Sequence, residues 1–329
     1  VTGVQTCALP ICSQGKIGSE NLSYGNLSIK QEHEYCYLGI LFTRNGLFNR
    51  AQNYLFEKAR KASFKLKQVV AQSNLKPKVS LFLFHSLVSP ICKYASELWA
   101  PVSLGSSSGN KLFKDCENKL PMEKLYLSYC KFVLGVNKKA VNLAVRGELG
   151  TYPLMLHGLR KILKYNRRLS LFGTEHLMHN AFLTSKQLEV EKSSKSWLGF
   201  FTNIGGICGG EVHDIQMTYN KILRLYRSYF MSQLQDISSG KLTLYAKLKH
   251  SHGYENFCQI IENANHRRAL TRLRISAHSL NIEVGRYDRH GINRNQRLCR
   301  ICQLGEVEDE RAFLLRCAAY VTQRETLMR

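Results

Sequence analysis

The sequence predicts a mainly α-helical fold, with a short β-hairpin near the N-terminus and a small cysteine-containing module at the C-terminus. Apolar residues recur at three- and four-residue steps through much of the 329-residue chain, which is the period of an amphipathic helix. Runs rich in aromatic and other β-forming residues are concentrated in residues 27–42. Near the other end, Cys299, Cys302 and Cys317 have the spacing of a small metal-binding module.

The first part of the chain is expected to contain two strands and a long helix. Leu27–Ile29 and Tyr35–Phe42 have the strand pattern, and a turn signal follows at residues 44–46. The apolar face of the helix consists of Ala51, Leu55, Ala59, Ala62, Leu66, Val69 and Val70. Its other faces carry Arg50, Lys58, Arg60, Lys61, Lys65 and Lys67. Because only Glu57 balances these cations, contact with a nucleic-acid strand and a simple solvated face explain them equally well.

Further helices are expected along the rest of the chain. One begins at Pro77 and ends or kinks at Pro90, and its apolar stripe is Val79, Phe82, Leu83, Leu87 and Val88. Others cover residues 122–134 with Gly135 as a cap, 153–172, 212–230 and 266–279. Tyr219, Tyr226 and Phe230 keep helical spacing, which favours the core over base stacking. The stretch 193–210 is rich in Ser and Gly and is the best candidate for a hinge.

The formal net charge of +23 indicates a polyanionic partner, because the positive residues are spread over most of the chain. Nucleic acid is the first candidate, and an anionic membrane surface is the second. The membrane is the weaker candidate, since the longest apolar stretch, Val79–Cys92, is interrupted by His85 and Pro90. Eleven cysteines, most of them scattered, indicate reduced thiols and an intracellular compartment instead of a disulfide framework.

The C-terminal cysteines form the candidate metal site. Two residues separate Cys299 from Cys302, and Cys317 follows fifteen positions later, so these soft ligands could close a tetrahedron around Zn²⁺. The alternative is three small buried hydrophobic residues, which the neighbouring Arg297 and Arg300 disfavour. The segment that leads to this site carries Arg267, Arg268, Arg272, Arg274, Arg286, Arg289, Arg294, Arg297 and Arg300 against only Glu283 and Asp288. Such an arginine-rich segment suits a phosphate backbone.

Several short motifs occur in the same order in LINE-type (non-LTR) retrotransposon polyproteins, including those of jockey-like elements, where they follow the polymerase palm. These motifs are Tyr37-Leu38-Gly39-Ile40, Pro90-Ile91-Cys92-Lys93-Tyr94-Ala95-Ser96-Glu97-Leu98-Trp99 and Gly147-Glu148-Leu149-Gly150-Thr151-Tyr152-Pro153-Leu154. The ending, with Cys299, Cys302, Glu308-Asp309-Glu310, Phe313-Leu314-Leu315-Arg316-Cys317 and Tyr320, resembles their C-terminal zinc knuckle. The resemblance covers roughly residues 24–329 and depends on the shared order of the motifs.

This resemblance implies part of an RNA-directed DNA polymerase that copies element RNA at a nicked chromosomal target, in the nucleus and cytoplasm. It implies a primer-grip turn at Tyr37, Leu38 and Gly39, which steadies the growing 3′ end, and a thumb that tracks the template–primer duplex for residues 52–88. The implied partners are element RNA and target DNA. The cations expected to contact them are Lys58, Arg60, Lys61, Lys65, Lys67, Arg267, Arg268, Arg272, Arg274, Arg297 and Arg300.

Two departures from the family pattern limit what the resemblance implies. Polymerase catalysis needs clustered carboxylates that hold two Mg²⁺ ions, and the family supplies them in an aromatic-Ala-Asp-Asp turn. The sequence has no Asp-Asp pair, so we expect the catalytic motif and its Mg²⁺ to lie upstream of Val1, and this fragment not to polymerise. The second departure is Ala312, which stands where the family has His. Water or His290 would then have to complete the zinc site, and we expect a lower zinc affinity.

On this interpretation the chain divides into seven parts. They are a translated sequencing adapter (1–12), the end of a polymerase palm with the primer-grip-like hairpin (13–45), thumb-like helices (46–135), connecting helices (136–192), the hinge (193–210), a helical region (211–264) and the arginine-rich segment with the zinc-knuckle-like module (265–329).

Two other functions stay open at the level of the sequence. One is a non-enzymatic zinc-knuckle nucleic-acid-binding protein, derived from such an element and kept for a host role. The other is a self-sufficient nuclease that uses Glu308, Asp309 and Glu310. For these three carboxylates, an acidic loop that caps the following helix and balances the arginines is the simpler interpretation.

Overall fold

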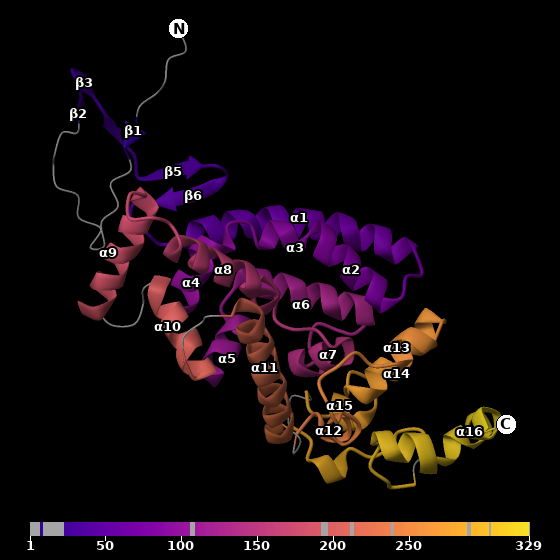
Figure 1. The fold of residues 1–329 in the computed structure, drawn as a ribbon. Helices are drawn as coiled ribbons and strands as arrows, with labels where there is room; N and C mark the ends of the chain where they lie inside the picture. Colours follow the sequence, from indigo (N-terminus) through magenta and orange to yellow (C-terminus); the bar gives the residue numbers. More distant parts are fainter. Residues whose placement is uncertain are drawn as a thin grey trace. The chain divides into compact units, whose positions relative to one another are not determined.

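The computed structural model describes residues 7–8, 23–105, 109–191, 197–210, 214–237, 240–287, 291–302 and 304–328. Over these residues the chain is mainly helical, and its strands pair as short two-stranded sheets near the N-terminus (Figure 1). The predicted fold class is therefore confirmed. No helix in this described part is both long and apolar enough to cross a lipid bilayer.

The chain forms two compact units, each built from segments that are distant in the sequence. Unit 1 contains residues 1–69, 82–126 and 152–226, and unit 2 contains residues 70–81, 127–151 and 227–329. The division falls inside the helices α1 (Asn49–Gln72), α2 (Pro77–Leu87), α6 (Pro121–Leu134) and α11 (Ile215–Ile237). The two compact units are therefore interleaved along the chain. The seven consecutive parts expected from the sequence stay a prediction, because helical periodicity and composition report only local order.

Unit 1 combines the small sheets with a helical core. In that core α4 packs against α5, α8 and α10, while α9 packs against α8 and α10. Trp99 of α4 is fully buried, and its indole N–H donates to the carbonyl of Tyr94 over 2.9 Å. The strands are β1 (Cys7–Ala8), β2 (Ser23–Tyr24), β3 (Leu27–Ser28), β4 (Lys30–Gln31), β5 (Glu34–Tyr37) and β6 (Ile40–Thr43). The helices wholly within this unit are α3 (Ser89–Cys92), α4 (Ser96–Leu104), α5 (Asn110–Asn118), α8 (Leu154–Ser170), α9 (Leu177–Glu191) and α10 (Trp197–Cys208).

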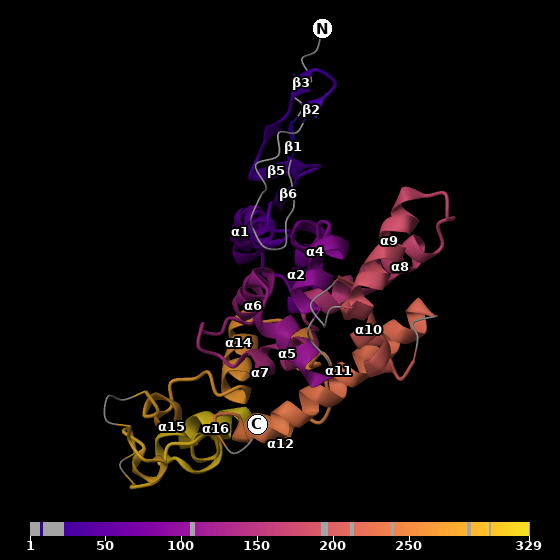
Figure 2. The ribbon, with the colours of Figure 1, turned by 90° about the vertical axis from the view of Figure 1, so that its left-hand side faces the viewer.

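The strand pattern predicts a single strand for Tyr35–Phe42, but the structure forms a hairpin whose turn lies where the resemblance implies the primer-grip turn. Strands β5 and β6 pair in antiparallel register, with Tyr37 opposite Ile40. Leu38 and Gly39 between them have φ of 48° and 80°, as a two-residue hairpin turn requires. The aromatic run hides this turn because its residues all favour strands. The hairpin lies beside the start of α1 (Figure 1 and Figure 2).

Two further expectations concern α2 and the Ser- and Gly-rich stretch 193–210. The stripe predicted for α2 is largely wrong, because Val79, Phe82 and Leu87 are exposed while Leu81 and Phe84 are buried. A short apolar helix offers more than one possible buried face, so its phase is hard to read. Most of the Ser- and Gly-rich stretch 193–210 forms α10, whose Trp197 donates its indole N–H to the Glu97 carbonyl over 2.8 Å. Residues 193–196 of that stretch lie outside the described part, and a hinge role there stays a prediction.

Unit 2 is built around the end of α6, α7, the second half of α11 and α14. Its core includes Tyr129, Phe230 and Tyr245, all fully buried or nearly so. Gly135 ends α6 with φ of 65°, which confirms the predicted cap. The elements of this unit are α7 (Asn142–Leu149), α12 (Thr243–Leu248), α13 (Phe257–Ile260), α14 (Ala264–Arg274), α15 (Asn281–Val284), α16 (Val321–Met328) and the short helices η1 (Arg294–Gln296), η2 (Ala312–Arg316) and η3 (Ala318–Tyr320).

The motif Gly147–Leu154 has a structural role at its unit 2 residues. Glu148 is completely buried and accepts hydrogen bonds from Arg274 of α14 at 3.0 to 3.3 Å. Gly150 has φ of 57°, and a Cβ there would come within 2.3 Å of the backbone nitrogen of Tyr254. Only glycine fits at this position, because a side chain would meet backbone that cannot move aside. This motif therefore ties α7 to the segment that precedes α13.

Candidate metal centre and basic surface

The C-terminal module brings its three cysteines together by pairing two short segments. Leu298 and Val307 form an antiparallel bridge. The amide of Cys299 donates to the carbonyl of Glu306 over 2.9 Å, and Gly305, with φ of 71°, lies in the connecting turn. The turn holds Cys302 near Cys299, and η2 then returns the chain to Cys317. The three cysteines that the spacing singled out therefore lie together in one cluster.

The sulfur atoms of Cys299, Cys302 and Cys317 all lie within 4.8 Å of one another. Cys299 and Cys317 are buried, their sulfurs are 3.9 Å apart, and all three thiols are free. A hydrogen bond from the backbone amide of Leu304, together with the neighbouring thiols, lowers the pKa of Cys302. Burial and the other two thiols raise the pKa of Cys317. The cluster could hold a metal ion, since three soft ligand atoms lie within 4.8 Å of one another and one of the thiols, that of Cys302, has a lowered pKa.

Ala312 faces this cluster from η2. It is 3% exposed and lines a small cavity of about 10 Å³ together with the three cysteines. That volume is about the space of one water molecule. The position at which the resemblance predicts a histidine is therefore directed at the sulfurs, as a fourth ligand would be. His290, the alternative ligand, lies outside the described residues.

The acidic run beside the cysteines is divided among separate structural contacts. Glu308 is buried, accepts from the amide of Asn281 over 2.7 Å and has its other oxygen 3.8 Å from the Cys299 sulfur. Asp309 accepts from the amide of Ala312 over 2.7 Å, which confirms the predicted helix cap. Glu310 lies 3.0 Å from His278. Burial tends to raise the pKa of Glu310. The hydrogen bonds from His278 and Ser276 outweigh burial and keep this pKa below its ordinary value.

Helix α1 gathers only some of its predicted nucleic-acid contacts on one face. Lys58, Lys61 and Lys65 are exposed and recur at three- and four-residue steps, so they share one stripe. Tyr54 begins the stripe, and the ammonium of Lys58 lies 4.2 Å from its ring centre. Two other predicted cations, Arg60 and Lys67, point to other sides of the helix. Arg60 pairs with Glu57.

The arginines of α14 divide into two groups. Arg267 is 6% exposed and donates to the carbonyls of Ile261, Glu262 and Leu75. Arg274 pairs with Glu148 and Glu255. Both therefore hold the fold together. Arg268 and Arg272 are exposed at the end of α6, where Arg272 donates to the carbonyl of Gly135 over 2.8 Å.

The remaining predicted contacts lie on the N-terminal hairpin and beside the cysteines. Tyr37 and Leu38 are exposed at the hairpin turn, and the hydroxyl of Tyr94 donates to the Leu38 carbonyl over 2.6 Å. This bond joins two of the motifs on which the resemblance depends. Arg297 donates to the carbonyls of Ile282 and Ile292, so it is a structural residue. Arg300 is exposed.

Unit 2 also contains lysines that lie near one another and that the sequence did not predict as nucleic-acid contacts. Lys131 donates to the carbonyl of Lys138 over 2.8 Å, and the charge of Lys241 adds to burial in lowering the pKa of Lys131. Tyr287 lies between two of them, with ammonium groups 4.8 Å (Lys139) and 5.5 Å (Lys241) from its ring centre. Together with the two exposed arginines of α14 these residues form what we call the basic surface: Lys131, Lys138, Lys139, Lys241, Arg268 and Arg272.

One local signal could have indicated part of this surface. Lys138 and Lys139 are adjacent and closely follow the glycine that ends α6. Lys241 and Tyr287 carry no such signal, because only the fold brings them to this place. Glu283 is the carboxylate that the structure sets against the group, and it pairs with Lys241 over 2.6 Å and with Arg286 over 3.0 Å.

The chain was compared with protein-family models, curated proteins and solved structures. No family model, no curated protein and no solved structure matches the chain.

Proposed function

We propose that this chain is the nucleic-acid-binding C-terminal part of a LINE-type reverse transcriptase, with thumb, connecting helices and zinc knuckle. RNA and DNA are its partners, and polymerase chemistry belongs to the palm of the parent enzyme. The basic surface is the observation that carries the proposal. Six cations from three distant segments lie near one another there, four of them exposed and two, Lys131 and Lys241, partly buried. Such a concentration of charge attracts phosphate backbones. The net charge of +23 and the ordered motifs support the same conclusion.

Binding to a fluorescent RNA hairpin should weaken steeply as salt rises, because each phosphate contact releases a counterion. The double variant Lys138→Ala/Lys139→Ala removes two exposed cations of the basic surface. We expect weaker binding, and a plot of log affinity against log salt whose slope is smaller by about 2. Fluorescence anisotropy across a salt series measures both quantities.

The matched control is Lys114→Ala/Lys124→Ala, which removes two exposed lysines outside the basic surface. It should keep a steeper salt dependence than the test variant. Absence of binding at low salt, or binding without salt dependence, would contradict the proposal. Equal effects of the two double variants would exclude the basic surface as the contact.

We further propose zinc as the metal of the cysteine cluster. In a tetrahedral site with zinc–sulfur bonds of about 2.3 Å, neighbouring sulfurs are about 3.8 Å apart. The separation of 3.9 Å between Cys299 and Cys317 suits this geometry. Bound there, zinc would hold the two paired segments of the module together, since structural zinc contributes directly to folding.

Restoring a histidine at position 312 should strengthen metal binding. Ala312 lines the small cavity beside the sulfurs, and so does Leu304, which is largely exposed. When the Leu304 side chain moves aside, the imidazole of the variant Ala312→His can supply the fourth ligand. We expect zinc affinity to rise at least about tenfold, because loss of an outer-shell partner alone typically costs 10- to 100-fold. Cobalt titration, followed by thiolate-to-metal absorbance and zinc competition, gives the affinity.

The matched control is Ala319→His, which adds the same side chain at an exposed position. It should leave the affinity unchanged. If both histidine variants bind zinc as the unchanged chain does, the inward orientation of position 312 has no role in metal binding.

A further inference from the structure

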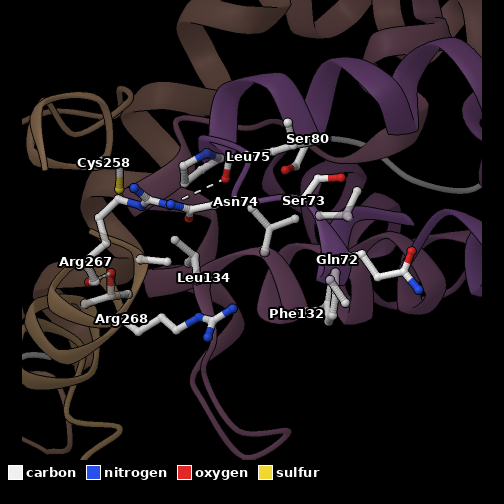
Figure 3. Close-up of a pocket in the computed structure, with 16 residues that line it drawn as sticks. Gln72, Ser73, Asn74, Leu75, Ser80, Phe132, Leu134, Cys258, Arg267 and Arg268 are labelled. Atoms are coloured by element: carbon white, nitrogen blue, oxygen red, sulfur yellow. Dashed lines mark hydrogen bonds between the residues drawn. The ribbon is translucent and has the colours of Figure 1, made fainter. Parts of the chain in front are cut away.

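A cavity in unit 2 adjoins the basic surface. Its volume is about 230 Å³, and it lies between the α1–α2 connection, the end of α6 and α14. Figure 3 shows Arg267 and Arg268 entering from one end, while Gln72 and Phe132 lie at the other. None of its sixteen lining residues is acidic. The cavity therefore offers cationic and polar groups to a ligand without an opposing carboxylate.

One end of the cavity is fixed in place by Arg267. Its guanidinium directs three hydrogen bonds to carbonyls, including one to Leu75 in the α1–α2 connection over 3.4 Å. The side chain is buried, so its charge acts through a poorly screened environment. Arg267 thus ties the connection to α14 and gives this wall a fixed positive charge.

Arg268 supplies the group best suited to meet a ligand. It is exposed, and its chain runs so close to Gly135 that a Cβ there would come within 2.5 Å of the Arg268 Cγ. The absence of a side chain at Gly135 leaves room for Arg268 to run along the cavity. Its guanidinium is directed towards Phe132 (Figure 3). A planar guanidinium can stack on a base or bind a phosphate through two parallel hydrogen bonds.

The other lining groups complement a nucleobase. Gln72 and Asn74 each offer an amide, which can donate and accept hydrogen bonds. Phe132 and Leu134 supply an apolar wall for the face of a ring. The volume is smaller than the roughly 300–1,000 Å³ of pockets for drug-sized ligands. It suits a ligand of about one nucleotide.

We propose that this cavity binds one unpaired nucleotide of a single-stranded RNA or DNA whose backbone lies on the basic surface. Arg268 belongs to both features, so the same strand reaches the cavity directly from the phosphate contacts. This inference rests on the proposed function, because it needs a strand on the basic surface. It adds a preference for unpaired bases, which phosphate contacts alone do not provide.

The test compares two single-stranded DNA dodecamers of equal charge, one with bases and one abasic throughout, at fixed salt. We expect the strand with bases to bind at least about fivefold more tightly, since stacking of one base typically contributes that much or more. An RNA dodecamer with the same base sequence distinguishes a preference between RNA and DNA. Fluorescence anisotropy gives the dissociation constants.

The variant Gln72→Ala/Asn74→Ala removes both amides without changing the charge. Both side chains are exposed, so the fold should be retained, which circular dichroism verifies. Its affinity for the strand with bases should fall towards that for the abasic strand, which it should bind as the unchanged chain does. The matched control is Asn53→Ala/Gln68→Ala, at exposed positions of α1 outside the cavity.

The outcomes separate this inference from the proposed function. Equal, salt-dependent binding of both dodecamers overturns the cavity and leaves the proposed function standing. A preference for bases that the Gln72→Ala/Asn74→Ala variant retains in full also overturns it, because the two amides that the inference assigns to the base then have no part in binding it. If neither strand binds at low salt, the proposed function fails and this inference fails with it.

Discussion

Replacing Arg274 by methionine should lower the free energy of unfolding by about 3–5 kcal/mol, which is the usual cost of removing one partner from a buried ion pair. Arg274 is the shared partner of Glu148 and Glu255, and Glu148 has no exposed surface. Burial already raises the pKa of Glu148 above its ordinary value, and the hydrogen bonds and charge of Arg274 oppose that rise. Without the arginine, Glu148 must either become protonated or remain as an uncompensated buried charge.

The double variant Arg274→Met/Glu148→Leu distinguishes this mechanism from a simple loss of packing. It removes both charges of the buried pair and leaves Glu255 beside its second partner, Lys249, which is 2% exposed. We expect the double variant to be more stable than Arg274→Met alone, since apolar groups of similar size can replace a buried pair at little cost. Urea unfolding followed by circular dichroism measures both.

A matched surface pair provides the control. Arg60 and Glu57 form an ion pair one helical turn apart, and both side chains are more than half exposed. Such pairs contribute little, so Arg60→Met should leave the unfolding midpoint unchanged. A double variant that is less stable than Arg274→Met would contradict the explanation, because the loss would then come from packing.

The elements that the sequence predicted well depend on local information. Helix α1 follows from an apolar period that the chain repeats over six turns, and the Gly135 cap follows from a single residue type. The cysteine cluster belongs to the same class, because Cys299 and Cys302 are close in the sequence and one turn suffices to bring them together. Only the approach of Cys317 needed a longer return of the chain.

What the sequence did not predict depends on contacts between distant residues. The arginines of α14 look alike in the sequence, but one is clamped by three carbonyls (Arg267) and another by buried carboxylates (Arg274). The basic surface combines Lys131 with Lys241, which lie 110 positions apart. No periodicity or motif in the sequence indicates that these two lysines lie close together. Charge composition therefore predicts a polyanionic partner, which stays a prediction, while the fold shows which cations are exposed.

Acidification from pH 6.5 towards pH 4 should destabilise the fold strongly. Burial, and then the charge of Lys93, lowers the pKa of His85 from 6.5 to about 4. Burial also lowers the pKa of His252 to about 4, although its hydrogen bond to the Thr151 carbonyl opposes this. Above pH 6.5 both states hold these rings neutral. As pH falls below 6.5, the two histidines bind protons in the unfolded chain but stay neutral in the folded chain, so the free energy of unfolding decreases.

The magnitude follows from the size of the two shifts. Lowering the pKa of one ring from 6.5 to about 4 corresponds to roughly 3 kcal/mol of stability, lost progressively as pH falls from about 6.5 to about 4. Below pH 4 the contribution of these two rings becomes constant, because both states are then protonated. Urea unfolding at a series of pH values measures the loss.

Removing one ring should remove its share of the pH dependence. In the variant His252→Gln, the amide can still donate to the Thr151 carbonyl but cannot be protonated, so the loss of stability between pH 6.5 and pH 4 should shrink by roughly 3 kcal/mol. His250→Gln, at an exposed position two residues earlier, is the matched control and should keep the full pH dependence. A His252→Gln profile parallel to that of the unchanged chain would show that this buried ring is not a source of the acid sensitivity.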